Sequence, residues 1–388
     1  MHTRGVQTTR DAWCFNHSRN ALWETVSRAA DAYNSYAARN DSTGTNPKEF
    51  SWCQKTRKAA EDGRKYQPDE NRIFLSDFRP FVKSWLFTDG LLNWSAYRTS
   101  SLFPDQDTPN LAIGVPSRGF RGEFSVLMSA RMPGLYFAST DCSEFFPLYK
   151  YGVNDSLEEN DLFTGAGIPK EMVRNDGITD AGLKYFQDAY PGETITKEDL
   201  FYYVYGLLHS EDYRAKYADN LSKELPRIPR VKTAADFWAF SRAGRELGDL
   251  HVNYETVEPY PVTIKQGDLR LADIKNAEGF YRVTKWAFGK AGKDKDKTTV
   301  IYNANITMQD VPMEAYDYVV NGKPALEWVM ERQVVKTDKD SGIENDANNY
   351  ATETVGNPAY PLELFQRVIT VSLRTMEIVH GLPKLEVM

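Results

Sequence analysis

The residues of this sequence best suited to chemistry are basic side chains that could bind a polyanion. Four of them lie in the segment GKAGKDKDK, residues 289–297: Lys290, Lys293, Lys295 and Lys297. Strand-like sequences over 281–288 and 298–303 make this segment the nine-residue loop of a long hairpin. A two-stranded ribbon fits the major groove of duplex DNA, where lysines reach phosphates or guanine edges. Because Asp294 and Asp296 halve the charge, an ordinary solvated loop is an equal alternative.

A second basic group is a pair of arginines in PSRGFRGE, residues 116–123. Glycines follow Arg118 and Arg121, so the backbone can approach a polyanion closely while the guanidinium forks reach phosphate or guanine. The alternative is a surface turn with ordinary ion pairs. Two residues spaced by three in an irregular loop need not point the same way. We therefore expect at most one of the two arginines to touch a base edge.

Four further side chains on or beside the predicted hairpin are chemically suited to reading bases: Arg282, Lys285, Asn303 and Asn305. Arginine and lysine pair with guanine in the major groove, and asparagine pairs with adenine. These residues are the next candidates if the arginine loop is plain surface.

Short catalytic motifs are missing from the sequence. The text nearest to a phosphate-binding loop, Gly289-Lys-Ala-Gly-Lys-Asp, lacks the required spacing and hydroxyl residue. No G-x-G-x-x-G follows a strand, and no G-x-S-x-G is present. The five histidines and three cysteines have no partner at metal-ligand spacing. We predict no catalytic residue, metal site or cofactor in this chain, with an unrecognised carboxylate–metal nuclease site as the alternative.

The composition indicates a folded protein with several subdomains. The chain has 388 residues, of which 41% are hydrophobic, and a formal net charge of −7. This global charge does not announce a nucleic-acid partner, but a local basic patch is enough to bind one. No apolar run approaches the roughly 18 residues of a membrane span, and the N-terminus lacks the apolar region of a signal peptide. We expect a cytosolic protein with reduced thiols.

The order of the predicted elements favours an α+β fold with short-stranded sheets segregated from helical segments. A helix is expected over 11–40, and strands are expected at the apolar runs RIFL, SWLF, LAIGV, SVLM and LYFA between residues 72 and 151. A polar loop (40–47) and an acidic connection (154–161) lie between elements. The chain divides into five parts, helical at both ends: 1–70 helical, 71–155 β-rich, 156–252 helical, 253–333 containing the hairpin, and 334–388 helical.

Helix signals are clearest in the second half of the chain. Thr196 and Ser210 are suited to cap two successive helices, and 236–252 forms a third. A last helix begins at Pro361 and stops at Gly381. The aromatic residues of these helices are expected in the core. His209 and His251 fall at helix C-termini, where a cation would suit the helix dipole.

Longer segments resemble the C-terminal regions of large single-chain restriction-modification proteins. ITKEDLFYYVYGLLHSEDYRAKYADNLSKELPRIPRV (195–231) is similar to one such segment, and NRIFLSDFRPFVKSWLF (71–87) resembles the segment downstream of their adenine methyltransferase domain. RDAWCFNHSRNAL (10–22) resembles the stretch after that domain's catalytic motifs, and 302–333 also matches. The best match is the Type ISP family. The methyltransferase's Asn-Pro-Pro-aromatic motif is not reproduced, because Gly356-Asn-Pro-Ala-Tyr360 lacks the second proline.

The resemblance implies a role. Type ISP proteins fuse a nuclease, a helicase-like ATPase, a coupler, an N6-adenine methyltransferase and a target recognition domain. This chain would be the last of these, with residues 1–70 as the connector after the methyltransferase. Its partners would be duplex DNA and the preceding domains of a bacterial or archaeal polypeptide, which would use S-adenosylmethionine, ATP and Mg. The alternatives are a divergent nuclease or methyltransferase fragment, and a protein-interaction module of a phage-defence assembly.

Overall fold

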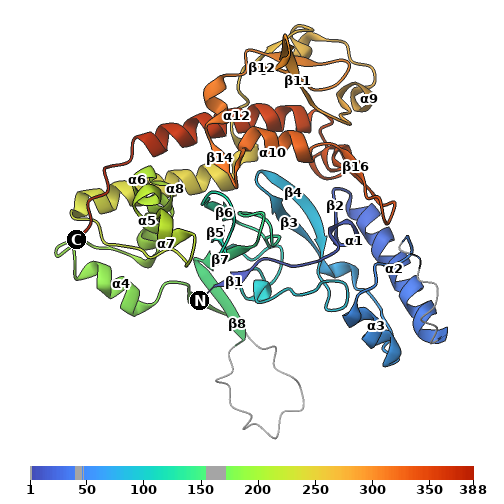
Figure 1. The fold of residues 1–388 in the computed structure, drawn as a ribbon, viewed down its shortest axis with the longest axis horizontal. Coiled ribbons are helices and arrows are strands. Elements are labelled where there is room, and N and C mark those ends of the chain that lie inside the picture. The colour runs from blue at the N-terminus through green and yellow to red at the C-terminus, as the bar shows by residue number, and fades with distance from the viewer. Residues whose placement is uncertain (1, 40–45, 47, 154–171) are drawn as a thin grey trace, which may run out of the picture.

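The computed structural model describes residues 2–39, 46, 48–153 and 172–388 (Figure 1). The predicted connections over 40–47 and 154–161 fall almost entirely outside these residues. The helices are α1 (Asp11–Cys14), α2 (Arg19–Arg39), α3 (Gln54–Glu61), α4 (Asp180–Gln187), α5 (Lys197–His209), α6 (Glu211–Lys216), α7 (Ala218–Leu221), α8 (Ala234–Val252), α9 (Ala277–Tyr281), α10 (Ala325–Arg332), α11 (Ala347–Asn349) and α12 (Tyr360–His380).

The strands are short and form several small antiparallel sheets. They are β1 (Thr3–Arg4), β2 (Phe15–Asn16), β3 (Ile73–Arg79), β4 (Val82–Phe87), β5 (Ala112–Pro116), β6 (Leu127–Ser129), β7 (Ser143–Pro147), β8 (Tyr149–Val153), β9 (Met172–Asp176), β10 (Thr263–Ile264), β11 (Ala287–Ala291), β12 (Asp294–Ile301), β13 (Thr307–Gln309), β14 (Val319–Val320), β15 (Lys323–Pro324), β16 (Val335–Thr337) and β17 (Glu344–Asp346). Within the described residues, three sheets have more than two strands, in the orders β1-β7-β5-β6, β2-β4-β3 and β10-β13-β12-β11. The predicted α+β class is confirmed.

Two hydrophobic cores hold these layers together. The first joins α2 and the β2-β4-β3 sheet to α10, α12 and the β10-β13-β12-β11 sheet, so both ends of the chain share it. The second lies between α5, α8 and residues of β5 and β6. Helix α12 runs beside α8 and α10 and links the parts (Figure 1). The five-part division of the chain stays a prediction.

Helices α5 and α8 cross at very short range, and two glycines permit it. A Cβ added to Gly206 would lie 2.1 Å from the Phe240 carbonyl oxygen, and one added to Gly244 would lie 1.9 Å from that of Tyr202. Neither helix could carry a side chain at this crossing without moving apart. The capping residues predicted for this region are confirmed, because Thr196 and Ser210 accept backbone hydrogen bonds from Asp199 and Tyr213.

Three predicted elements are wrong because long-range contacts override local pattern. The helix expected over 11–40 is interrupted at Phe15–Asn16, which pair with β4 instead. The run LYFA (135–138) is a turn whose apolar side chains are buried, so its hydrophobicity reflected burial and not a strand. The helix expected after Ser210 is split at Tyr217 into two short helices, α6 and α7.

The interior contains three buried histidines, which corrects the expectation of cations at helix ends. His209 closes α5 and His251 lies near the end of α8, as predicted, but both are buried. His251 lies 2.7 Å from the Tyr205 hydroxyl and 2.9 Å from that of Thr375. Burial lowers the pKa of His251 to about 3 and that of His17 to about 4, and it lowers the pKa of His209 well below its ordinary value. All three are neutral at pH 7.

We expect acid to destabilise the fold below about pH 6.5. The folded pKa values lie below the unfolded one, so the unfolded chain binds more protons as the pH falls, and stability present above pH 6.5 is lost. Each buried histidine is expected to lower the free energy of unfolding by about 1.4 kcal/mol for each pH unit below about 6.5, and so by about 2 kcal/mol at pH 5. Urea unfolding at pH 7, 6 and 5 measures this loss. Replacing the exposed His380 by Gln is the control, and a free energy of unfolding constant over this range contradicts the prediction.

Candidate nucleic-acid interface

The predicted hairpin exists, but its nine-residue loop does not. Strand β11 pairs with β12 up to Ala291 and Asp294, which leaves only Gly292 and Lys293 in the turn. Gly292 has a φ of +67°, the conformation that a two-residue hairpin turn requires and that glycine adopts without strain. The strand expected over 281–288 is also corrected, because only its last two residues belong to β11 and α9 ends at Tyr281. Polar composition suggested a loop where backbone pairing forms a ribbon.

The tight ribbon gathers lysines at its tip. Lys290 and Lys295 are direct cross-strand partners and Lys293 lies in the turn, and all three are exposed. Like charges directly opposite each other are unfavourable, and Asp294 and Asp296 of the same ribbon end offset part of this positive charge. The fourth lysine, Lys297, is engaged elsewhere, because its Nζ lies 2.9 Å from the Glu327 carboxylate.

Three of the other four hairpin candidates hold the local structure. Arg282 pairs with the Asp346 carboxylate at 2.6 Å, and the Asp346 side chain is only 4% exposed. The Asn303 amide donates to the Phe280 and Arg282 carbonyls at 2.9 and 3.0 Å, and that of Asn305 donates to Phe280 at 3.1 Å. Lys285 is exposed. To read a base, Arg282, Asn303 and Asn305 would have to leave these partners, so their base-reading role stays a prediction.

The structure places the two loop arginines differently. Arg121 binds the Asp141 carboxylate through Nε and Nη2, at 3.2 and 2.6 Å, although its side chain is 90% exposed. Arg118 lies at the end of β5 and lines a groove. Gly119 and Gly122 both have positive φ, so the loop depends on glycine at these positions.

This groove has a volume of about 620 Å³ and lies at one end of the β1-β7-β5-β6 sheet. Its lining is His2, Thr3, Arg4, Tyr97, Arg98, Arg118 and Glu144. Glu144 pairs with Arg4 at 3.2 Å and lies 3.5 Å from His2. Within the described residues, neither Arg98 nor Arg118 has a carboxylate within 4 Å. The groove therefore offers guanidinium groups to an anion.

Sequence reasoning found only Arg118 among these residues. Apart from Glu144 of β7, the others come from the N-terminal segment and from the loop WSAYR, residues 94–98, which lie about 90 residues apart in the sequence. The one signal available was the mixture of aromatic residues and arginine in WSAYR. In the structure Trp94, Tyr97 and Arg98 are all exposed.

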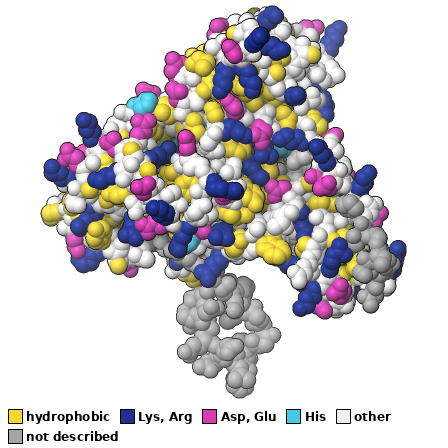
Figure 2. Space-filling model, in the orientation of Figure 1, with side chains coloured by type: hydrophobic (Ala, Val, Ile, Leu, Met, Phe, Trp, Pro, Cys, Tyr) yellow, Lys and Arg dark blue, Asp and Glu magenta, His cyan; other side chains and the backbone are white. Residues whose placement is uncertain are grey.

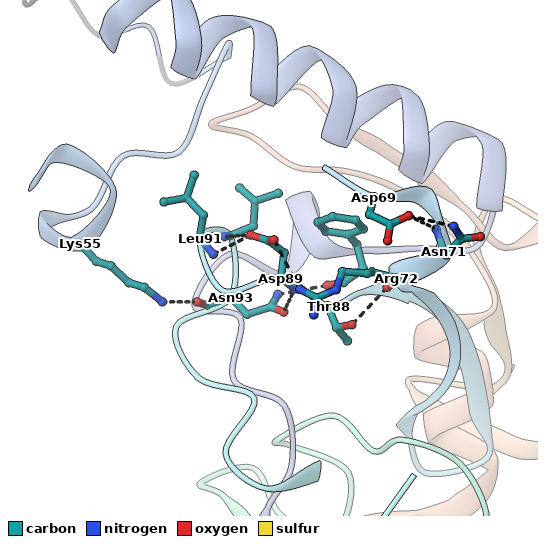
Figure 3. Close-up of polar contacts among 10 residues, drawn as sticks. Lys55, Asp69, Asn71, Arg72, Thr88, Asp89, Leu91 and Asn93 are labelled. Carbon is teal, nitrogen blue, oxygen red and sulfur yellow. Dashed lines mark hydrogen bonds and ion pairs between the residues drawn. The ribbon is translucent and has the colours of Figure 1, made fainter. Parts of the chain in front are cut away.

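Polar contacts hold the segment that immediately precedes this loop (Figure 3). The Asp89 carboxylate accepts the backbone N–H groups of Leu91 and Leu92 at 2.6 and 3.2 Å. Asn93 accepts from the Asp89 backbone at 2.8 Å and donates to the Phe87 carbonyl at 3.1 Å. Lys55 donates to the Asn93 carbonyl at 2.9 Å. The chain therefore enters the loop in a defined direction.

The surface as a whole is mixed in charge. On the face shown in Figure 2, basic and acidic side chains are interspersed and form no continuous basic patch. In the part of the chain that the structure describes, no group of three or more His, Cys, Asp and Glu side chains is placed to hold a metal ion. No described helix is long and apolar enough to cross a membrane.

An α+β chain that presents an arginine groove and a lysine-tipped ribbon is typical of nucleic-acid-binding domains. The chain belongs to the Type ISP C-terminal specificity domain family, whose model matches residues 1–364. The predicted family resemblance is thereby confirmed. No curated protein sequence matches the chain.

Solved structures agree with this family. The chain is similar over its full length to the ATP-dependent Type ISP restriction-modification enzyme LlaBIII bound to DNA, with 31% identity and a TM-score of 0.84. It is also similar to a nuclease-deletion mutant of the Type ISP enzyme LlaGI in complex with a DNA substrate mimic, with 31% identity and a TM-score of 0.81. A DrdV–DNA complex is similar with 28% identity and a TM-score of 0.80. The chain spans only 24%, 33% and 36% of the length of these three chains.

The Arg282–Asp346 pair gives a test of structural roles in the hairpin region. We expect Arg282→Ala to lower the free energy of unfolding by about 2 kcal/mol, because it leaves a buried carboxylate without its partner; the half-exposed arginine keeps the loss below that of a fully buried pair. Lys285→Ala, three residues away and exposed, should change it by less than about 0.5 kcal/mol. Urea unfolding measures both. Equal stability of the two variants contradicts a structural role for Arg282.

Proposed function

We propose that this chain is the target recognition domain that selects a duplex DNA site for a longer single-chain restriction-modification polypeptide. The observation that carries the proposal is similarity over the whole chain to Type ISP enzymes whose structures contain DNA. The chain matches only part of each of these enzymes, so the nuclease, ATPase and adenine methyltransferase steps belong to other parts of such a polypeptide. Those parts would use S-adenosylmethionine, ATP and Mg in the cytoplasm of a bacterium or archaeon.

In this proposal the chain has no catalytic role of its own. Its buried histidines are neutral and packed against other side chains in the interior. The exposed cations that remain available are suited to binding and not to bond cleavage. Arginine forks match phosphate and guanine geometry, and lysines act as point charges toward phosphate. Arg98 and Arg118 would contact DNA from the groove, and Lys290, Lys293 and Lys295 would contact it from the ribbon.

We expect the isolated chain neither to hydrolyse ATP nor to methylate or cleave DNA. Duplex binding with no turnover in Mg, ATP and S-adenosylmethionine is the expected result. ATP turnover, methyl transfer or cleavage that is lost on mutation of a residue of this chain contradicts the proposal. Absence of binding to any duplex in 50 mM salt contradicts it as well, and favours a module that binds protein.

The ribbon lysines are expected to contribute affinity without sequence preference. Replacing Lys290, Lys293 and Lys295 together by Ala should weaken binding to every duplex. The slope of log K against log salt should become shallower by about 0.9 per lost phosphate contact, so by at most about 2.7. Fluorescence anisotropy over a salt series measures the slope. Lys184→Ala, an exposed lysine of α4, is the control, and an unchanged slope in the triple variant assigns the ribbon to solvent.

Arg118 and Arg121 form a matched pair for testing base reading. Arg118→Ala should lower affinity mainly for a duplex selected by binding from a randomised pool, by about tenfold or more relative to unselected DNA, if it pairs with guanine. Equal loss on both DNAs would indicate a phosphate contact. Arg121→Ala should change neither affinity, because Asp141 already holds its guanidinium. Loss of binding in Arg121→Ala but not in Arg118→Ala contradicts this assignment of the groove.

A further inference from the structure

Two large aromatic side chains of the 94–98 loop are exposed, and one of them, Tyr97, lines the arginine groove. Trp94 is 49% exposed and Tyr97 is 41% exposed. The Arg4 guanidinium lies 5.9 Å from the centre of the Tyr97 ring. Tyrosine and tryptophan have an apolar ring with a polar tip, and such side chains are enriched at binding surfaces. Trp94 and Tyr97, the two exposed rings of this loop, are together named the aromatic ledge.

The backbone of the aromatic ledge is held in a conformation that tyrosine rarely adopts. Tyr97 has a φ of +47°, which costs energy for any residue with a side chain. Both ends of Tyr97 are fixed, because its backbone N–H donates to the Ser95 hydroxyl at 3.0 Å and its own hydroxyl donates to Gln7 at 2.7 Å. Strain maintained at an exposed aromatic residue indicates a functional requirement for the ring's position.

The backbone of the aromatic ledge is also held by hydrogen bonds to the N-terminal segment. Trp94 and Ser95 donate backbone hydrogen bonds to the Gln7 carbonyl at 2.9 and 3.1 Å, and Gln7 donates to the Ser95 carbonyl at 2.8 Å. The Asp89 and Asn93 contacts hold the preceding residues (Figure 3). The backbone that carries the rings is therefore held in place, so less conformational entropy is lost when a ligand stacks on them.

Charge around the ledge selects the kind of ligand. Arg4, Arg98 and Arg118 line the adjoining groove, and among the described residues its lining contains one carboxylate, that of Glu144, which pairs with Arg4. Flat apolar rings beside several guanidinium groups are complementary to nucleobases attached to a phosphate backbone. Each base–aromatic stack contributes substantially to binding, whichever base is involved, because every base has a π face.

We propose that Trp94 and Tyr97 stack on nucleobases of bound DNA that are displaced from the helical stack, while Arg98 holds an adjacent phosphate. The proposal rests on the proposed function, because the bases belong to the DNA that the domain binds. It assigns to this loop a preference for locally unstacked DNA, which is separate from phosphate binding at the ribbon.

The test compares a perfect duplex with the same duplex carrying a short unpaired bubble. Wild-type protein should bind the bubble more tightly, and Trp94→Ala and Tyr97→Ala should each lose about 5- to 150-fold in affinity for it, with a smaller loss on the duplex. Trp94→Phe keeps a stacking ring and should stay close to wild type. DNA should quench the tryptophan fluorescence of the Trp94→Phe variant less than that of wild type, because the variant lacks Trp94.

A fourth variant separates stacking from folding. Asparagine tolerates left-handed backbone, so Tyr97→Asn should melt at or above the wild-type temperature and still lose affinity for the bubble. Failure of wild type to bind either DNA overturns the proposed function and this inference together. Normal duplex binding, with Trp94→Ala and Tyr97→Asn matching wild type on the bubble, overturns the stacking inference alone.

Discussion

The groove depends on the extended N-terminal segment, which pairs in succession with three separate parts of the chain. Thr3 and Arg4 pair with β7, Val6 bridges to Gly134, and Gln7 bridges to Ser95. Gly5 sits where a Cβ would lie 2.5 Å from the Gly134 carbonyl oxygen, so no other residue fits without a shift. This segment brings Arg4 to Glu144, lets Thr3 accept the Arg98 backbone N–H, and lets Gln7 hold Tyr97.

A second constraint is that carboxylates of this acidic protein pair with some of its basic side chains and leave others available for a ligand. Three of the candidate DNA-binding cations have a carboxylate within 3 Å and so form ion pairs within the fold: Arg121, Arg282 and Lys297. Among the cations without a carboxylate within 4 Å in the described residues, two lie at the groove (Arg98 and Arg118) and three at the ribbon tip (Lys290, Lys293 and Lys295). A chain with net charge −7 can thus still present available basic side chains at these two places, because electrostatic recognition depends on nearby charges within about a Debye length more than on the total.

The sequence by itself determined the elements whose signals are local. The caps at Thr196 and Ser210, helix α8 and the last helix follow from hydrogen-bonding side chains and apolar periodicity within a few residues. The α+β class followed from the order of such signals. Membership of the Type ISP family followed from long matching segments, because many residues specify a family better than any short motif. Basic side chains in the hairpin and at Arg118 could be named as candidates, although their use stays a prediction.

Only the tertiary structure decided how these residues meet. Phe15–Asn16 leave a helical pattern because strand β4 offers hydrogen bonds, and the polar segment 289–297 becomes a ribbon because its two halves pair. The groove joins Arg4, Arg98 and Arg118, whose spacing of about 90 and 20 residues carries no periodic signal. Whether a cation is available depends on which carboxylate folding brings beside it, as Asp141 does for Arg121. Such contacts are long-range, and local propensity contains no information about them.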